Sequence, residues 1–400
     1  MSEMSEEDGM KEKNANKGLN RRDFLKIGIA GTTSVILGSS GLSGAVQNYV
    51  PSSFSFPKPV YRTLGRTGIR PTIVSFGAML TPEAEVIALA IENGVNYIDT
   101  ARKYMDGRNE EIVGRAIKGK RDKVFLATKT LPTSTSKEDI VKDVETSLRT
   151  LRTDYIDIIQ LHNLTGKERI FVAETREALT ALRKQGKVRF FGVTTHKNQA
   201  EVLNALVDEP DRFFDTALVA YNFKSSKEER QAIARAAKAN IGIIAMKTQA
   251  GGYETKELGG ISPHQAALKW VLQDANVSNA IPGMKDLAML KEDIAVMGMP
   301  FTYTDARILE RYDTAIQPYY CHMCGKCEGT CLMGVEISTV NRSLMYADGY
   351  RNVELAQATY REIPADVSAS ACLDCTGCTA QCVNGLDIAA KMARARRILA

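Results

Sequence analysis

The sequence has no cysteine before Cys321, although it holds eight cysteines in 400 residues. It also lacks an excess of one charge: 52 basic and 47 acidic residues leave a net charge of +5 without a basic stripe, which argues against nucleic acid as a partner. Hydrophobic residues make up 44% and charged residues 25%, values that exclude a disordered, collagen-like or coiled-coil chain. The chain is therefore globular, and its late cysteines are the first indication of function.

The N-terminal segment lacks the roughly 20 strongly apolar residues that a permanent transmembrane helix requires. Its apolar stretch, Ile27 to Gly44, is diluted by glycine and serine and follows Arg21-Arg22-Asp23-Phe24-Leu25-Lys26. This segment resembles a twin-arginine export signal. Ser43-Gly44-Ala45 offers a cleavage point, and because Ala45 stands where a lipoprotein signal needs cysteine, we expect no lipid anchor. The resemblance implies export to the periplasm or the outer face of the cytoplasmic membrane; an uncleaved anchor and a chance Arg-Arg pair are the alternatives.

From residue 61 to residue 297, eight short β-branched runs alternate with eight segments of helical period. The predicted strands are Thr72–Phe76, Tyr97–Asp99, Val124–Lys129, Tyr155–His162, Val188–Thr194, Thr216–Tyr221, Gly242–Lys247 and Asn279–Pro282. The predicted helices are Glu83–Asn93, Glu111–Lys118, Lys137–Leu151, Ile170–Gln185, Asn198–Val207, Lys227–Ala239, Pro263–Gln273 and Leu287–Val296. Because right-handed crossovers place each helix outside its strand, this alternation predicts an α/β fold, a closed (β/α)8 TIM barrel. An open doubly wound sheet is the alternative, but Phe76-Gly77-Ala78-Met79 lacks the expected Gly-rich phosphate turn.

Polar side chains stand where three of these strands end. Asp99, Lys129 and His162 end the second, third and fourth strands, and Tyr104 follows the second. In a barrel these ends share one rim. Reduction of a carbonyl needs a proton donor, and a phenol with a pKa near about 10 is a poor one unless a cation stabilises its phenolate. We therefore expect Tyr104 to be the general acid, Lys129 to lower its pKa, Asp99 to hold Lys129, and His162 to orient the carbonyl oxygen.

Each of these residues has an ordinary structural explanation when taken alone: a loop cap, a rim aromatic, an extended lysine or a buried histidine. Together they resemble the aldo-keto reductase signature, in the stretch Gly94-Val95-Asn96-Tyr97-Ile98-Asp99-Thr100-Ala101 followed by Tyr104, Gly107 and Glu110. Three further segments match the family in order: Ser147 to His162, Gly186-Lys187-Val188-Arg189 and Gly192-Val193. The resemblance implies a barrel that reduces aldehydes or ketones with NADPH, with Asp99, Tyr104, Lys129 and His162 at the catalytic positions.

The sequence departs from the family where the nicotinamide is held. The family has Ser-Asn and Gln at positions that read Thr194, Thr195 and Leu218 here, while Tyr221 stands at the position of an aromatic that stacks on the nicotinamide. A leucine cannot hydrogen-bond the carboxamide. The adenosine-phosphate segment resembles Ile281 to Lys285 and Lys291-Glu292-Asp293, with Lys285 expected to meet a 2′-phosphate. The alternative is a capped helix with ordinary surface charges, so NADP(H) binding stays open.

The eight cysteines form two copies of one spacing. Cys321, Cys324, Cys327 and Cys331 follow C-x2-C-x2-C-x3-C, and so do Cys372, Cys375, Cys378 and Cys382. This spacing is typical of two 4Fe-4S clusters, in which the fourth cysteine of each run ligates the other cluster. On that precedent Cys382 joins the first three cysteines and Cys331 joins the second three, although Leu332 and Val383 replace the usual proline.

Zinc and disulfides are the alternatives for these cysteines. Four-cysteine zinc sites normally pair two separated knuckles, and C-x2-C-x2-C is an awkward framework for four disulfides. Helical patterns at Ser338–Ala347, Val353–Tyr360 and Asp387–Leu399 resemble helical two-cluster ferredoxin modules. We expect a signal peptide at 1–45, a linker at 46–60, the barrel at 61–297, a connector at 298–317 and a mainly helical, ferredoxin-like two-cluster domain at 318–400.

The signal and the clusters support each other, because the twin-arginine route exports folded proteins whose cofactors are already inserted. We therefore predict an exported iron-sulfur oxidoreductase that acts on a small-molecule carbonyl or alcohol and exchanges electrons with a redox partner protein or a membrane carrier. Hydride carries two electrons, each cluster passes one, and the sequence shows no flavin motif to bridge the difference. One alternative is an electron-transfer or binding subunit with a non-catalytic docking barrel. Another is an ordinary NADPH reductase whose clusters only stabilise the fold or sense redox state.

Overall fold

The computed structural model describes residues 55–254 and 262–400. Residues 56–400 form one compact unit. The predicted twin-arginine signal, its cleavage point and most of the linker lie outside the described residues. In the part that is described, no helix is long and apolar enough to cross a membrane.

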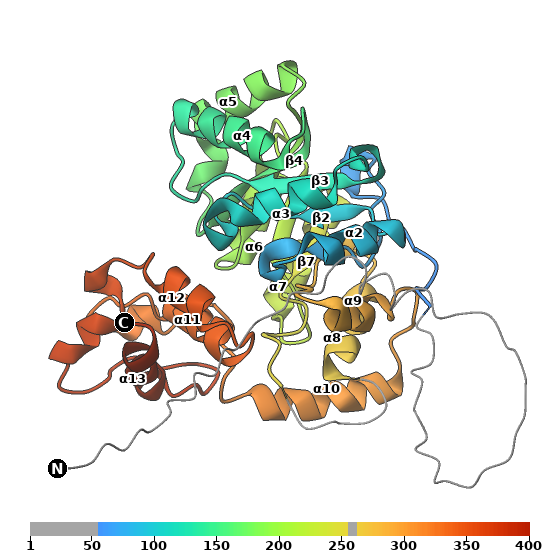
Figure 1. The fold of residues 1–400 in the computed structure, drawn as a ribbon. Coiled ribbons are helices and arrows are strands. Elements are labelled where there is room, and N and C mark those ends of the chain that lie inside the picture. The colour runs from blue at the N-terminus through green and yellow to red at the C-terminus, as the bar shows by residue number, and fades with distance from the viewer. Residues whose placement is uncertain (1–54, 255–261) are drawn as a thin grey trace, which may run out of the picture. The chain divides into compact units, whose positions relative to one another are not determined.

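Eight parallel strands form one sheet in the order of the sequence (Figure 1). They are β1 (Phe76–Gly77), β2 (Tyr97–Asp99), β3 (Phe125–Lys129), β4 (Ile156–Leu164), β5 (Val188–Thr195), β6 (Thr216–Ala220), β7 (Gly242–Met246) and β8 (Asn279–Ala280). Parallel bridges from Val74 to Ala280 and from Gly77 to Gly283 join the first strand to the last. The sheet therefore closes on itself, and the predicted (β/α)8 barrel architecture is confirmed.

A helix follows each of the eight strands. The barrel helices are α2 (Ala84–Glu92), α3 (Arg108–Ala116), α4 (Lys137–Leu151), α5 (Ala173–Lys184), α6 (Gln199–Asp208), α7 (Lys227–Lys238), α8 (Pro263–Leu272) and α9 (Leu287–Ile294). Side-chain caps fix several starts: the hydroxyl of Ser136 accepts from the Asp139 N–H at the start of α4, and Ser226 and Glu229 form a capping box at α7.

The observed bounds differ from the predicted ones mainly at the ends of elements. The first strand was expected over Thr72–Phe76, but only Phe76 and Gly77 pair continuously, and Val74 makes an isolated bridge. The fourth predicted helix was expected from Ile170, but Val172 has extended backbone angles, and this helix, α5, begins after it. Before Val172 the chain forms a short 3-10 turn, Glu168–Phe171.

Two hydrophobic cores stabilise the barrel. The inner core fills the barrel with side chains that include Tyr97, Ile158 and Leu218, and Leu64 from the N-terminal turn belongs to the same cluster. The outer core packs the helices against the strands and includes Phe76, Ile98 and Phe191. Strand residues alternate between the two cores, as the period of two in a strand requires.

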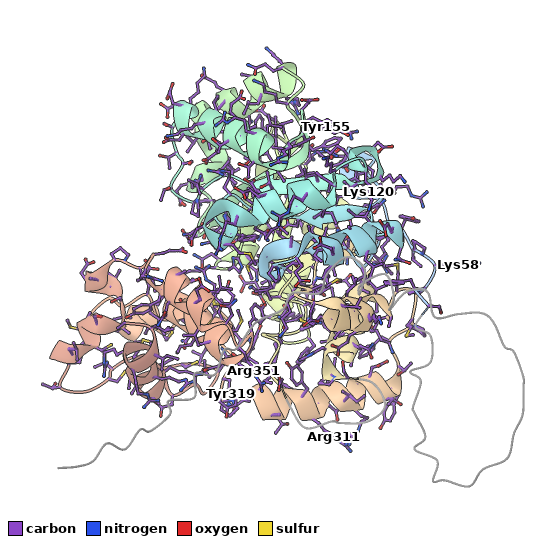
Figure 2. The ribbon with its side chains drawn as sticks, in the orientation of Figure 1. Lys58, Lys120, Tyr155, Arg311, Tyr319 and Arg351 are labelled. Atoms are coloured by element: carbon purple, nitrogen blue, oxygen red, sulfur yellow. The ribbon has the colours of Figure 1, made fainter. Side chains whose placement is uncertain are left out.

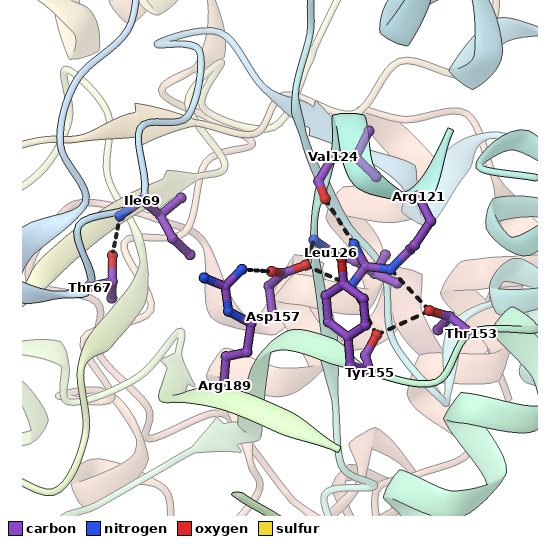
Figure 3. A network of polar contacts seen from close by, with 9 residues as sticks. All are labelled: Thr67, Ile69, Arg121, Val124, Leu126, Thr153, Tyr155, Asp157 and Arg189. Carbon is purple, nitrogen blue, oxygen red and sulfur yellow. Dashed lines mark hydrogen bonds and ion pairs between the residues drawn. The ribbon is translucent and has the colours of Figure 1, made fainter. Parts of the chain in front are cut away.

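Asp157 is the centre of a polar network at the start of strands β3, β4 and β5 (Figure 3). One of its carboxylate oxygens accepts from Arg121 (2.7 Å) and from the Leu126 N–H (2.9 Å), and the other accepts from Arg189 (2.6 Å). Arg121 also lies over the ring of Tyr155, 3.8 Å from its centroid. This network lies at the opposite ends of the strands from Lys129 and His162, so Asp157 ties the barrel together rather than serving the rim.

The C-terminal part of the chain is mainly helical, as predicted. It contains α10 (Tyr303–Ile316), α11 (Ile337–Asp348), α12 (Val353–Tyr360) and α13 (Ile388–Ile398). Helix α10 packs against α8, where the buried pair Lys269 and Asp305 meets at 2.6 Å. Helices α11, α12 and α13 share a separate core that includes Val340, Leu344 and the buried Cys327.

Replacing Asp157 by asparagine should lower the free energy of unfolding by about 3 kcal/mol, because two arginines lose a buried counter-charge. Urea denaturation followed by circular dichroism measures this loss. The matched control is Glu177→Gln, which removes an exposed ion pair with Lys137 (3.4 Å) and should cost less than about 1 kcal/mol. Equal stability losses in the two variants would contradict the role given to Asp157.

Candidate functional site

The carboxyl ends of β2, β3 and β4 bring the predicted catalytic residues to one cavity. Asp99 and Lys129 are the last residues of β2 and β3, and His162 lies near the end of β4. Asp99, Tyr104 and His162 line a cavity of about 990 Å³, and Lys129 is buried beside it. This size is at the upper end for a small-molecule pocket. The structure thus brings together all four residues of the predicted tetrad.

Lys129 is held by Asp99 inside the barrel. Its ammonium group forms an ion pair with Asp99 Oδ1 and donates a second hydrogen bond to the carbonyl of Thr100 at 2.7 Å. Gln160, the register partner of Lys129, donates to the other oxygen of Asp99 at 2.9 Å. Both charged side chains are almost fully buried. Burial raises the pKa of Asp99 and lowers that of Lys129, while their mutual attraction acts against both shifts.

Tyr104 is presented by a tight turn that a buried asparagine supports. Tyr104 starts the turn Tyr104–Gly107, in which Met105 and Asp106 have φ angles of 52° and 54°. Such left-handed angles are uncommon outside glycine and indicate a strained turn. Asn109 donates to the carbonyl of Ala78 at 2.7 Å and accepts from the Thr100 hydroxyl at 2.6 Å. The turn is thereby fixed to the ends of β1 and β2.

The pKa of Tyr104 is raised well above its usual value, chiefly by burial and then by the negative charge of Asp99. The expectation that Lys129 brings this pKa below its usual value is therefore wrong. The ammonium group lies over the ring, 4.8 Å from its centroid, and its charge is already compensated by Asp99. Tyr104 therefore keeps its proton at neutral pH, which is the form that a general acid requires.

His162 faces Tyr104 as a neutral imidazole. The two rings meet edge to face, with centroids 5.9 Å apart. Burial lowers the pKa of His162 well below its usual value, and the positive charges of Lys129 and Lys103 lower it further. Its Nδ1 is buried without a hydrogen-bond partner among the described residues. A neutral imidazole with one N–H donor suits the predicted orientation of a carbonyl oxygen.

The residues predicted to hold the nicotinamide carboxamide point elsewhere. The Thr194 hydroxyl accepts from the Asn163 N–H at 2.7 Å, and the Thr195 hydroxyl donates to the Leu164 carbonyl at 2.8 Å. Both side chains are fully buried, and neither lines the cavity. Leu218 does line it but offers no hydrogen bond. The two threonine hydroxyls hold the last residues of β4, so Thr194, Thr195 and Leu218 do not fit a carboxamide clamp.

Tyr221 also does not reach the cavity, so its predicted role in stacking on the nicotinamide is wrong. Leu218 points into the barrel, and the alternation along the strand turns Tyr221 outward. Its hydroxyl donates to Asp274 at 2.7 Å, and its ring lies against Trp270 with centroids 5.2 Å apart. The residue is part of the packing between the sheet and helix α8.

The predicted adenosine-phosphate residues are divided between the cavity and the core. Lys285 and Glu292 line the same cavity as Asp99, and Lys291 lies on the same helix as Glu292, α9. Asp293 is buried and accepts from Gln249 at 2.6 Å, and its pKa is raised well above the usual value by burial and by Glu292. Lys285 in the lining of the cavity suits a phosphate group, whereas the residues predicted to hold the nicotinamide amide offer no partner for it.

Helix α11 and the turn after it complete the cavity, which the sequence did not reveal. Arg342, Tyr346 and Tyr350 line it opposite the barrel. Lys247, which follows β7, donates to the hydroxyl groups of Tyr346 at 3.2 Å and Tyr350 at 3.4 Å. Nearby, Arg351 (labelled in Figure 2) forms an ion pair with Glu254. Of these cavity residues, only Lys247 had a sequence signal, because it stands at the end of a predicted strand.

The cysteine thiols fall into two groups that take members from both repeats. The pKa of Cys321 is raised to about 12, chiefly by burial. The neighbouring thiols of Cys327, Cys324 and Cys382 also raise it. The pKa of Cys372 is raised by burial and also by Cys331, Cys375 and Cys378. All eight cysteines are free. The fourth cysteine of each repeat is therefore a neighbour of the other repeat.

No three His, Cys, Asp or Glu side chains within residues 55–254 and 262–400 converge so as to hold a single metal ion. The four thiolates of a cubane bind four separate iron corners, so they need not converge on one point. Two groups of four thiols therefore fit cluster ligation better than a structural zinc site, in which the sulfurs all lie about 2.3 Å from one ion.

Comparison with known proteins places the barrel in a family. The profile of the aldo/keto reductase family matches residues 80–258. Methylglyoxal reductase YeaE of Escherichia coli (strain K12) is 30% identical over 244 residues, which cover 57% of this chain and 84% of that protein. Aldo-keto reductase YhdN of Bacillus subtilis (strain 168) is 43% identical over 120 residues, 28% of this chain and 36% of its own length.

A further sequence match and a solved structure agree with this family. The match to the oxidoreductase YqkF of Bacillus subtilis (strain 168) spans 42% of that protein, so the chain covers less than half of YqkF and YhdN. An aldo/keto reductase from Klebsiella pneumoniae, solved in complex with NADP and acetate, is 26% identical with a TM-score of 0.55, and the match covers 63% of this chain and 94% of that one. From its sequence and its barrel, the chain belongs to the aldo/keto reductase family.

Proposed function

We propose that the protein is an exported iron-sulfur oxidoreductase whose barrel interconverts a carbonyl compound and its alcohol. The observation that carries the proposal is the arrangement of Tyr104 and His162 at one cavity, with the buried pair Lys129 and Asp99 beside them. Each of these residues has a role in carbonyl reduction that its surroundings support.

The proton chemistry follows from these four residues. His162 donates a hydrogen bond to the carbonyl oxygen, and Tyr104 transfers its proton to that oxygen as the C=O π bond breaks. Lys129, held by Asp99, stabilises the phenolate that remains. NADPH, when bound, would supply the hydride that forms the new C–H bond and would itself be oxidised. The reverse sequence oxidises an alcohol.

Two 4Fe-4S clusters would be held by the two mixed groups of cysteines and would supply one-electron transfer. A small cavity of about 40 Å³ supports a link to the reductase cavity, because Cys321 lines it together with His196, Lys247 and Arg342. These three residues also line the large cavity. The group that contains Cys321 would therefore be the nearer of the two clusters to the substrate.

Export is the part of the proposal that rests on the sequence alone. The Arg21-Arg22 segment supports the twin-arginine route, which suits a protein with cluster ligands because it carries folded chains. The protein would then act in the periplasm or at the outer face of the cytoplasmic membrane. Its electrons would come from a redox partner protein or a membrane carrier.

A second candidate function is an electron-transfer or binding subunit with a non-catalytic barrel. The orientation of Tyr221 and the hydrogen bonds of the Thr194 and Thr195 hydroxyls to the end of β4 favour it, because these residues then offer no contact to a nicotinamide. Nucleotide content separates the two candidates. Protein purified without air should release one equivalent of nucleotide on denaturation if the barrel performs hydride chemistry, whereas reducible clusters without nucleotide favour the scaffold.

Replacing Tyr104 by phenylalanine should lower the reduction of methylglyoxal at least about 100-fold, because the general acid is lost. The assay follows substrate consumption with NADPH or reduced methyl viologen as donor, and the visible absorbance of the clusters should not change. Tyr303→Phe, at an 80% exposed position on α10, is the matched control. Undiminished turnover by the Tyr104 variant would remove Tyr104 as the acid.

The grouping of the thiols predicts how pairs of cysteine substitutions affect iron content. Replacing Cys331 and Cys372 by serine alters one predicted group and should leave about four iron atoms per chain out of about eight. Replacing Cys331 and Cys321 alters both groups and should leave fewer than about four. Iron and acid-labile sulfide are measured after anaerobic purification. The opposite order of iron contents would show that each repeat binds its own cluster.

Changing Arg21 and Arg22 together to lysine should keep the protein in the cytoplasm, because twin-arginine signals depend on the arginine pair rather than on charge alone. Cell fractionation and immunoblotting measure the distribution. Lys11→Arg with Lys13→Arg is the control, since it also keeps the charge and lies upstream. Export of the twin-lysine variant at the wild-type level, or a wild-type protein confined to the cytoplasm, contradicts this part of the proposal.

A further inference from the structure

Arg342 carries a positive charge from the C-terminal region to the wall of the reductase cavity. It lies on α11, is 9% exposed, and lines both the large and the small cavity. One of its terminal nitrogens donates to Asn163 Oδ1 at 3.2 Å, and its Nε is buried without a hydrogen-bond partner in the described part of the chain. A buried guanidinium with an unused donor is costly unless a ligand meets it.

Lys247 adds a second positive charge beside Arg342. Its ammonium group lies 4.6 Å from the ring centroid of Tyr346 and 5.0 Å from that of Tyr350, and it donates to both hydroxyls. Within residues 55–254 and 262–400, neither Lys247 nor Arg342 forms an ion pair with an acidic side chain. This end of the cavity therefore holds two cations with only neutral partners.

Three acidic residues of the cavity wall are already paired. Asp99 is bound to Lys129, Glu362 to Lys103 at 2.6 Å, and Glu254 to Arg351. The remaining acidic residues of the wall lie on elements other than α11 and the loop after β7. They are Asp106, Glu111, Asp286, Glu292 and Glu354. None of them supplies a counter-charge to Arg342 or Lys247 in the described structure, so an anion from solution can do so.

The positive charges of Arg342 and Lys247 shift the pKa values of two neighbouring side chains. Burial lowers the pKa of His196 well below its usual value, and Arg342 and Lys247 lower it further. Burial alone would raise the pKa of Tyr346, but Lys247 and Arg342 outweigh burial and lower it. A site that disfavours an imidazolium and favours a phenolate also favours a bound carboxylate.

The cationic pair lies next to the reacting groups. Asn163, which accepts from Arg342, directly follows His162 in β4. The positive charge of Arg342 also acts to lower the pKa of Tyr104. A negative group that contacts Arg342 would therefore lie close to a carbonyl oxygen held by Tyr104 and His162, as in a molecule whose carboxylate is bonded to its carbonyl carbon.

We propose that Arg342 and Lys247 form a carboxylate subsite, and that the substrates of the barrel are 2-oxo acids or the corresponding 2-hydroxy acids. The inference rests on the proposed carbonyl chemistry and narrows its substrate class. It also assigns substrate recognition to a helix of the cysteine-containing region. The shared chemistry is anion binding, which the pyrophosphate of a nicotinamide nucleotide could also satisfy, so the test separates these two sources.

The test compares pyruvate with methyl pyruvate, its neutral ester. Isothermal calorimetry on the anaerobic holoprotein measures binding without any need for turnover, and steady-state kinetics measures kcat/KM for both compounds. Arg342→Gln should reduce the binding and the kcat/KM of pyruvate roughly 10- to 100-fold more than those of methyl pyruvate, because only the acid loses a charged hydrogen bond. Arg342→Lys keeps the charge and should restore part of the loss. Lys247→Gln is a second variant, should Arg342→Gln fail to fold.

Arg361→Gln is the matched control, since Arg361 is exposed at the end of α12 and its Nε donates only to the carbonyl of Gln357 in that helix. Equal losses for acid and ester, or wild-type protein that binds pyruvate no better than its ester, overturn the proposal. A variant that no longer binds NADP⁺ but still binds pyruvate would show that the anion site serves the nucleotide, and this result also overturns the proposal. Pyruvate that binds through Arg342 but is not reduced supports the subsite and contradicts the reductase function instead.

Discussion

The ion pair between Lys129 and Asp99 is the interaction on which the reductase cavity depends. Neither charge could be buried in a barrel interior without the other, and the amide of Gln160 and the carbonyl of Thr100 satisfy further polar atoms. The pair joins the ends of β2 and β3 and fixes the floor beneath Tyr104. It also leaves Lys129 nearly neutralised, so the phenol keeps its proton until a substrate arrives. The same contact thus gives both stability and the resting protonation state.

The sequence predicted the barrel because its signals are local and repeated. Strand β2 and helices α4 and α12 have the predicted bounds, since caps such as Ser136 and turns such as Gly94 act within a few residues. The tetrad was predicted because strand ends in a parallel barrel share one rim. The prediction for Tyr221 failed because this residue, directly after β6, continues the alternation that starts from the inward Leu218 and therefore lies outside the barrel.

What the sequence did not reveal depends on contacts between distant segments. The shift in the pKa of Tyr104 comes from burial and from Asp99, and burial requires α11 to cover the cavity. Arg342 and Tyr346 lie about two hundred residues from the tetrad and belong to no motif of the barrel. Asn109 and Gln160 read as ordinary polar residues until the strands are placed side by side.

Helix α11 lies between the two cysteine quartets, and its core packs around the buried Cys327. If the proposed clusters are bound there, the wall that faces Tyr104 depends on a group that oxygen destroys. Loss of the clusters would then remove the anchor of α11 and open the far side of the cavity, while the barrel itself stayed folded.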